Sequence, residues 1–427
     1  MTTADAHRAI DAVWRIESAR LIAGLARMLR DVGLAEELAQ DALVIALEKW
    51  PQTGVPDNPG AWLMATAKHR AIDRLRRLKL QQRKHEELGH ELEREWEDAT
   101  AELEAAMDDD IGDDLLRLVF TACHPLLSME ARVALTLRLL GGLTTDEIAR
   151  AYLVPESTVA QRIVRAKRTL SEANVPFEVP RGDELAERLS SVLGVIYLIF
   201  NEGYSATAGD DWMRPALCEE ALRLGRVVAG LAPNEAEVHG LVALMEIQAS
   251  RLRARTDPAG APILLLDQDR SRWDRLLIQR GFAALTRARQ LGGGLGPYAL
   301  QAAIAACHAR ANTAEQTDWD TIAALYATLS QSNPSPIVEL NRAVAVSMAS
   351  GPAAGLELVD NLASEPVLAS YHLLPSVRGD LLARLGRHEE AQAEFERAAG
   401  LTRNAREREF LLERSRASAR EAALPAG

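Results

Sequence analysis

The stretch GLTTDEIARAYLVPESTVAQRIVRAKRTL (142–170) predicts two short helices joined by a tight turn. Thr144 and Glu147 have the spacing of a capping box, which begins a helix. The residues from Leu153 to Pro155 interrupt that helix, and a second helix follows. Apolar residues in the second helix recur at the period of a buried face. They are Val159, Ile163, Ala166 and Leu170.

The opposite face of the second helix carries hydroxyl and amide side chains first and arginines further along. Small and amide side chains near the start of such a helix reach base edges, and arginines beyond them hold phosphates. We therefore predict a helix-turn-helix that binds DNA. A plain helical hairpin with a solvated basic face is the alternative. The candidate DNA-binding residues are Ser157, Thr158, Gln161, Arg162, Arg165 and Arg168.

The composition indicates a soluble, helical protein of several domains. The chain has 427 residues, 26% of them charged and only 4% aromatic, which offers little for a β-rich core. Its three cysteines are widely separated, which favours a reducing compartment and argues against a disulfide framework. The most apolar run, 191–200, is too short to span a bilayer. We expect a cytoplasmic protein with no membrane segment.

The net charge of −12 hides two opposed blocks. Residues 61–84 carry eight Lys or Arg against one acid, and residues 86–110 carry twelve acids against one base. The negative net charge of the whole chain argues against general affinity for nucleic acids, but the basic block at 61–84 does not.

The pattern of helices and breaks predicts four segments. Residues 7–80 form a helical unit, interrupted by the Pro- and Gly-rich stretch 51–60, which we expect to be a loop. Residues 81–112 form an acidic linker, and residues 113–173 a second helical unit. From 183 to 427, amphipathic helices alternate with short Gly or Pro breaks, which is typical of an antiparallel helical array.

One helical repeat is readable near the C-terminal end. Small residues and one aromatic follow the spacing of a tetratricopeptide (TPR) repeat, in which small residues let two helices approach closely. Pro375 stands where that pattern has Trp, and a non-repetitive bundle of hairpins is the alternative. The matching residues are Gly379, Leu382, Gly386, Ala391, Phe395 and Ala398.

The helix-turn-helix resembles region 4 of sigma-70-type RNA polymerase sigma factors, although Ala160 stands where these factors often carry a basic residue. GLAEELAQDALVIALEKWP (33–51) resembles region 2.2, and NPGAWLMATAKHRAIDRLRR (58–77) resembles regions 2.3 and 2.4. The order of the two regions and the short connector are typical of the extracytoplasmic-function group. The long C-terminal segment resembles the subgroup that carries a TPR-like extension. The expected fold is all-α: two small helical sigma domains followed by a TPR-like domain.

The resemblance implies two partners, core RNA polymerase (its β′ clamp and β flap) and promoter DNA. A stripe on one helix is expected to dock on the clamp: Glu37, Gln40, Asp41, Val44 and Glu48. A face of the next helix is expected to meet the −10 element: Lys68, His69, Asp73, Arg76 and Arg77. The second helix of the helix-turn-helix is expected to meet the −35 element. Gln52–Pro59 resembles the loop that receives a flipped base. Trp62 is interpreted as a core anchor, with base stacking as the alternative.

The C-terminal segment is expected to control activity in cis and to offer a surface to a protein or peptide partner. Two polar clusters are either ion pairs that hold a loop or a pocket: Asn201, Glu202, Tyr204 and Arg214, and Asp267, Asp269, Arg270 and Arg275. The acidic linker is either a nucleic-acid mimic in the polymerase or a solvated tether.

No enzyme signature, cofactor motif or metal-ligand spacing is present in the sequence. Hence we expect a transcription factor without catalytic activity, cofactor or metal. An alternative function is a ligand- or peptide-responsive helix-turn-helix regulator with a helical-repeat sensor. Such a regulator would bind operators without polymerase and has no need of the region 2 resemblance.

Overall fold

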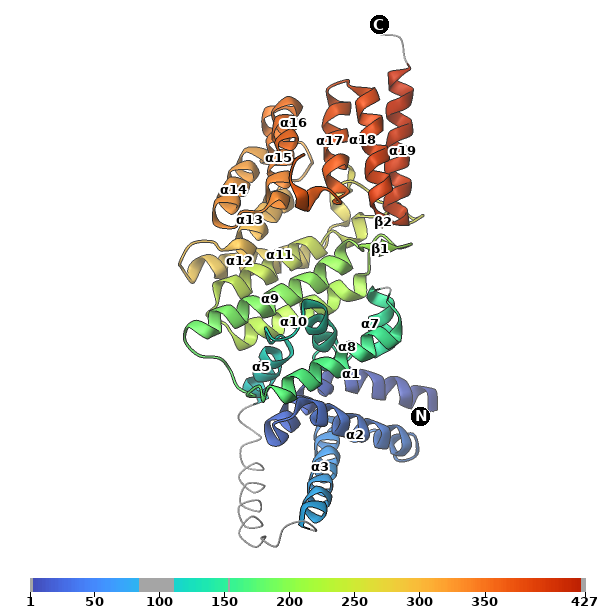
Figure 1. The fold of residues 1–427 in the computed structure, drawn as a ribbon, viewed down its shortest axis with the longest axis vertical. Coiled ribbons are helices and arrows are strands. Elements are labelled where there is room, and N and C mark those ends of the chain that lie inside the picture. The colour runs from blue at the N-terminus through green and yellow to red at the C-terminus, as the bar shows by residue number, and fades with distance from the viewer. Residues whose placement is uncertain (1–2, 84–110, 153, 424–427) are drawn as a thin grey trace. The chain divides into compact units, whose positions relative to one another are not determined.

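The computed structural model describes residues 3–83, 111–152 and 154–423. The chain divides into two compact units, which we call unit 1 (1–196) and unit 2 (197–427). Helices make up most of the described residues and the two strands have only two residues each, so the all-α fold class is confirmed (Figure 1). Most of the acidic linker, residues 84–110, lies outside the described residues.

Unit 1 contains the helices of both sigma-like segments. Helix α1 packs against α2, α3 and α5, and helix α8 packs against α6 and α7. The helices are α1 (Thr3–Leu29), α2 (Val32–Thr53), α3 (Pro59–Arg83), α5 (Ile111–Ala122), α6 (Met129–Leu139), α7 (Thr145–Tyr152) and α8 (Glu156–Glu172). Helix α9 (Asp183–Tyr204) contains the boundary between the units.

The loop expected at 51–60 is shorter than the sequence indicated. Helix α2 continues through Pro51 to Thr53, and α3 begins at Pro59. Pro51 lies in the last turn, so the hydrogen bond that a proline cannot donate is lost where the helix already ends, at Gly54 with a φ of 86°. The buried indole of Trp50 also holds this turn in place, since its ring meets that of Trp62 edge to face at 5.3 Å.

Unit 2 is a succession of helices in which neighbours along the chain pack together. They begin with α10 (Pro215–Leu231), α11 (Ala236–Ala249), α12 (Arg275–Gln290), α13 (Pro297–Arg310) and α14 (Trp319–Ser332). They continue with α15 (Pro336–Ser350), α16 (Pro352–Asn361), α17 (Leu373–Arg384), α18 (His388–Leu401) and α19 (Ala405–Ala422). Short 3-10 turns lie between some of them: η1 (Leu252–Ala254), η2 (Leu265–Asp267), η3 (Arg270–Arg272) and η4 (Pro366–Leu368).

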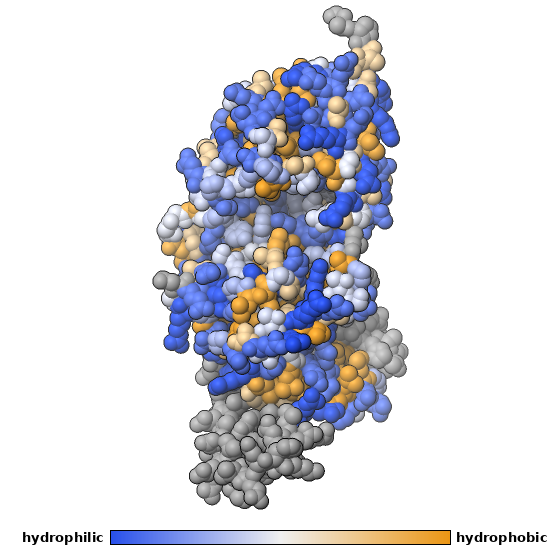
Figure 2. Space-filling view, in the orientation of Figure 1, coloured by the Kyte–Doolittle hydropathy of each residue, from blue (hydrophilic) through white to orange (hydrophobic). Residues whose placement is uncertain are grey.

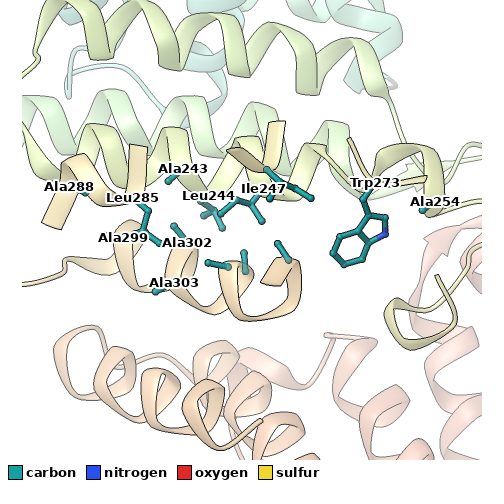
Figure 3. Packing of buried hydrophobic residues seen from close by; sticks show 14 residues of the cluster. Ala243, Leu244, Ile247, Ala254, Trp273, Leu285, Ala288, Ala299, Ala302 and Ala303 are labelled. Atoms are coloured by element: carbon teal, nitrogen blue, oxygen red, sulfur yellow. The ribbon is translucent and has the colours of Figure 1, made fainter. Parts of the chain in front are cut away.

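Small residues bring α11 and α13 close together. A Cβ at Gly240 would lie 2.7 Å from the backbone nitrogen of Ala299, so only glycine fits there. Figure 3 shows alanines of α13 facing Leu244 and Ile247 of α11. This narrow spacing explains how a chain with few aromatic residues fills the core of unit 2.

The hairpin α17–α18 has the packing expected from the TPR pattern. Phe395 is fully buried, and a Cβ at Gly379 would lie 3.0 Å from its ring. Gly386, in the turn between the helices, has a φ of 76°, which favours glycine. The assignment of the whole region to the TPR class stays a prediction.

A two-stranded contact joins the beginning and the end of unit 2. Strand β1 (Ala208–Gly209) pairs in parallel with β2 (Arg403–Asn404). The buried Asn404 side chain donates to the carbonyls of Ala206 and Asp211, at 3.1 and 2.8 Å. Helices α17 to α19 are therefore tied to the segment that follows α9.

No helix among the described residues is long and apolar enough to cross a membrane. On the face shown in Figure 2, apolar residues form scattered patches between hydrophilic ones.

Candidate polymerase and nucleic-acid interfaces

The capping box at the start of α7 is confirmed. The backbone nitrogen of Glu147 donates to Thr144 Oγ1 at 3.1 Å, and the backbone nitrogen of Thr144 donates to Glu147 Oε2 at 2.8 Å. These reciprocal bonds satisfy two donors that the first turn of a helix leaves free. Thr145 Oγ1 also donates to Glu156 Oε1 at 3.0 Å, which connects the starts of α7 and α8.

Helix α8 buries the four residues that the sequence pattern predicted, Val159, Ile163, Ala166 and Leu170. On the other side, the hydroxyl, amide and guanidinium groups remain accessible. Ser157, Gln161, Arg165 and Arg168 are exposed, whereas Thr158 and Arg162 are half-buried. Arg168 donates to Glu172 Oε1 at 2.6 Å, so this arginine already has an anionic partner one turn away. The face can present amides and cations to a DNA groove, and its role stays a prediction.

Cys123 and His124 precede α6 and have structural partners. Cys123 is buried, and burial raises the pKa of its thiol to about 11. Its sulfur lies 3.4 Å from Thr136 Oγ1. His124 Nδ1 accepts the backbone N–H of Leu126 at 3.2 Å. A thiol that stays protonated in a packed core is inert, which agrees with a packing role.

Helix α2 presents the stripe predicted to dock on polymerase. Glu37, Val44 and Glu48 are exposed, and Gln40 and Asp41 are half-buried. Glu37 pairs with Arg74 of α3 at 3.6 Å, a surface contact that a partner can displace at little cost. The exposed members form an acidic and apolar strip along one side of the helix, and docking stays a prediction.

Helix α3 carries the residues predicted to meet the −10 element. His69 and Asp73 are exposed, and Lys68 is half-buried. Arg76 and Arg77 belong to α3, but their side chains lie outside the described residues. Trp62 is half-buried against Trp50, which favours the core-anchor interpretation over base stacking.

Sequence reasoning missed Glu36, which joins the two sigma-like segments. Its side chain is buried, and its carboxylate accepts from Arg138 Nε of α6 at 2.7 Å and pairs with Lys167 of α8. Gln40 donates to the same carboxylate at 2.5 Å. A signal existed, because position 36 follows the buried Val32 by four residues and precedes the buried Ala39 by three.

The N-terminal half of α9 contacts the end of α5 within unit 1. Arg188 donates to the carbonyl of Phe120 at 2.9 Å, and Ser191 donates to the carbonyl of Cys123 at 2.8 Å. Arg132 of the next helix donates to Ser191 Oγ at 2.8 Å. The first turns of the C-terminal segment thus complete the end of a sigma helix, and the domain boundary at 183 stays a prediction.

Comparison with known proteins identifies the family. Residues 16–81 match the sigma-70 region 2 family and residues 117–170 match the sigma-70 region 4 family. The ECF RNA polymerase sigma factor SigK of Mycobacterium ulcerans is 32% identical over 153 residues, which cover 34% of this chain and 75% of SigK. The chain belongs to the extracytoplasmic-function group of sigma-70-type sigma factors.

Other relatives extend the comparison beyond the sigma domains. An uncharacterized protein of Rhizobium meliloti is 45% identical over 388 residues, which cover 91% of this sigma factor and 90% of that protein. The probable ECF sigma factor SigI of Mycobacterium tuberculosis is 26% identical over 175 residues, 40% of this chain and 58% of SigI. Residues 188–289 match a family of unknown function, DUF6596. No solved structure matches the chain.

Of the two polar clusters predicted in the C-terminal segment of this sigma factor, one forms and the other does not. In the first, Glu202 pairs with Arg214 and accepts from Thr207 Oγ1 at 2.9 Å, so the ion pair that holds a loop is present. The second does not form, because Asp267, Asp269 and Arg275 are exposed and the buried Arg270 turns to α13 instead. No cluster of potential metal ligands occurs among the described residues.

Proposed function

We propose that this sigma factor docks on core RNA polymerase through α2 and directs transcription from promoters that α3 and α8 recognise. We further propose that its C-terminal helical region controls this activity. The observation that carries the first proposal is the pair of polar surfaces in unit 1. One is the acidic and apolar strip on α2, and the other is the exposed amide and arginine face of α8.

The strip on α2 has the chemistry of a protein-binding surface, and the face of α8 has that of a DNA-binding surface. The strip on α2 combines exposed Glu37 and Glu48 with Val44, which is 52% exposed, and such a mixture suits a protein partner. The face of α8 offers Gln161 for base edges and Arg165 for phosphates. The sigma factor would promote no bond change, and promoter melting would draw on binding energy alone.

Two observations support control by the C-terminal region. The boundary between the units falls inside the continuous helix α9. The first half of that helix supplies Arg188 and Ser191 to the end of α5. A change that disturbs α9 would therefore reach the segment that precedes the helix-turn-helix.

Run-off transcription with purified core polymerase and genomic fragments tests the function. We expect the double variant Glu37→Ala/Glu48→Ala to weaken association with polymerase about tenfold, since it removes two charges from the docking strip. Glu357→Ala/Glu413→Ala, which removes two exposed charges from unit 2, is the matched control. No association of the unaltered chain with core polymerase would overturn the proposal, and operator binding without polymerase would favour the regulator.

A comparison of the full chain with residues 1–196 in the same assay tests whether the C-terminal region regulates transcription. Higher transcription by residues 1–196 would mean that the C-terminal region inhibits, and lower transcription would mean that it activates; either result supports regulation. Equal activity of the two proteins would contradict it.

A further inference from the structure

Two segments of unit 2 that the sigma function does not use meet at one place. Arg255, just after η1, lies over the Tyr204 ring, with Cζ 3.5 Å from the ring centroid. Tyr204 donates to Gln248 Oε1 at 2.9 Å, and Arg251 donates to the same oxygen at 3.3 Å. The segment NEGYSAT (201–207) therefore contacts the turn after α11.

Trp273 connects this turn to the segment DQDRSRWDR (267–275). The guanidinium carbons of Arg251 and Arg270 lie 5.5 and 4.9 Å from the centroid of its ring. Figure 3 shows Trp273 at one end of the packed row of α11 and α13, near Ala254. One tryptophan thus has two arginines beside it, and Arg255 follows one turn further along the chain.

The three arginines are buried without a carboxylate. Arg251, Arg255 and Arg270 are 9%, 7% and 9% exposed. Arg251 donates to the amide oxygens of Gln248 and Gln268, and Arg255 to the carbonyl of Tyr204. Arg270 donates to the carbonyls of His308 and Ala311 and to Thr317. Among the described residues, no acid forms an ion pair with any of the three, and the exposed Glu315 acts on Arg270 only from longer range.

Helix ends offset only part of this positive charge. Arg255 binds the last carbonyl of α9, and Arg270 binds carbonyls at the end of α13, where each helix carries about half a negative charge. Against three guanidinium groups, these two helix ends and the exposed carboxylate of Glu315, which acts on Arg270 from longer range, offset only part of the positive charge. A buried charge without a counter-ion is costly, so proteins pair nearly all of them. Elsewhere in unit 2, Arg214 and Arg226 have Glu202 and Glu246 as partners.

Among the residues that the structure describes, two further polar atoms at this place have no hydrogen-bond partner. Trp273 Nε1 and His308 Nδ1 are buried and make no hydrogen bond, although the two residues are only 4% and 8% exposed. Burial, together with the charges of Arg251 and Arg270, lowers the pKa of His308 to about 4. The ring is therefore neutral at pH 7 and adds no charge. An incoming acceptor can be bound by the indole N–H and by the free N–H groups of the arginines.

We propose that Arg251, Arg255, Arg270 and Trp273 form a binding site for an oxyanion, a carboxylate or phosphate group of a small molecule. Guanidinium groups bind both kinds of group through paired, charge-assisted hydrogen bonds, and the indole N–H of Trp273 adds one more donor. The site lies within unit 2 and does not depend on the sigma function proposed above. It gives the C-terminal region a way to respond to an anionic compound.

Calorimetric titration of the full chain with inorganic phosphate and with succinate, at constant ionic strength set by chloride, tests the site. We expect saturable binding of one anion per chain. At an anion concentration of about one hundred times Kd, the Tm should rise by about 5 °C. Saturation by phosphate alone or by succinate alone supports the site and identifies its chemistry. Saturation by neither overturns the proposal.

Arg251→Gln separates an anion site from a structural role. Removing an uncompensated charge should leave the Tm in chloride unchanged or raise it, and should weaken anion binding at least tenfold. Arg226→Gln is the matched control: it deprives the buried Glu246 of its partner, so it should lower the Tm without changing anion binding. A lower Tm for Arg251→Gln with unchanged anion binding would show that the cluster only holds the loop.

Discussion

Glu36 and Glu37 are neighbours in the sequence but have opposite environments in the fold. Glu36 is 3% exposed and pairs with Arg138 and Lys167, whereas the Glu37 side chain is 57% exposed. Glu36→Ala would leave two partly buried cations unpaired, so we expect a loss of about 2 kcal/mol in the free energy of unfolding. Glu37→Ala should cost less than about 1 kcal/mol. Denaturant unfolding measures both, and equal losses would contradict the assigned role of Glu36.

Gln161 and Arg165, one turn apart on α8, should affect DNA binding in different ways. Arg165→Ala should weaken binding to all sequences and reduce the slope of log K against log salt by about 1, because one phosphate contact is lost. Gln161→Ala should relax preference at one base position by about 1 to 3 kcal/mol. Binding measured over a salt series and against a library of −35 sequences distinguishes them. Exchanged effects would mean that the helix lies differently in the groove.

At the scale of the element, Gly379 and Gly400 test the packing of α17 against α18. A Cβ at Gly379 would meet the buried Phe395 ring at 3.0 Å, so Gly379→Ala should destabilise unit 2 by about 1 to 3 kcal/mol. Gly400 lies in α18 with nothing within 4 Å, so Gly400→Ala should be neutral or stabilising by up to about 1 kcal/mol. Thermal unfolding of the two variants checks this, and similar effects would mean that the helices are farther apart.

The helices could be predicted from the sequence where their buried residues recur at the helical period. The buried face of α8 and the capping box of Thr144 could be read from the sequence because both depend on residues at most a few turns apart. The extent of α2 could not be predicted, since a helix usually ends before a proline, whereas α2 continues for two residues beyond Pro51. The partners of Arg270 could not either. Its acceptors lie about forty residues away, and only the packing of η3 against α13 brings them near.

In the candidate interfaces too, local spacing predicted which residues are exposed but not which distant residues meet. Spacing placed Glu37, Val44 and Glu48 on one exposed strip of α2, as the structure has them. It gave no indication that Lys167, in phase with the buried Ile163 and Leu170, would reach back to Glu36. Contacts between segments that lie more than one hundred residues apart are set by how helices pack, and no local pattern encodes that.

At the scale of the molecule, the point at which unit 1 ends decides whether it can be studied alone. Residues 174–183, which contain two prolines, join α8 to α9 and invite truncation after Arg181, but this removes Arg188 and Ser191 from the end of α5. Two carbonyls then lose partners, one of them a charged donor, so 1–181 should be less stable than 1–196 by about 2 kcal/mol. This corresponds to a Tm lower by about 4 °C. Arg188→Ala in 1–196 should reproduce about half of the difference, and equal melting of 1–181 and 1–196 would mean that α9 contributes nothing to unit 1.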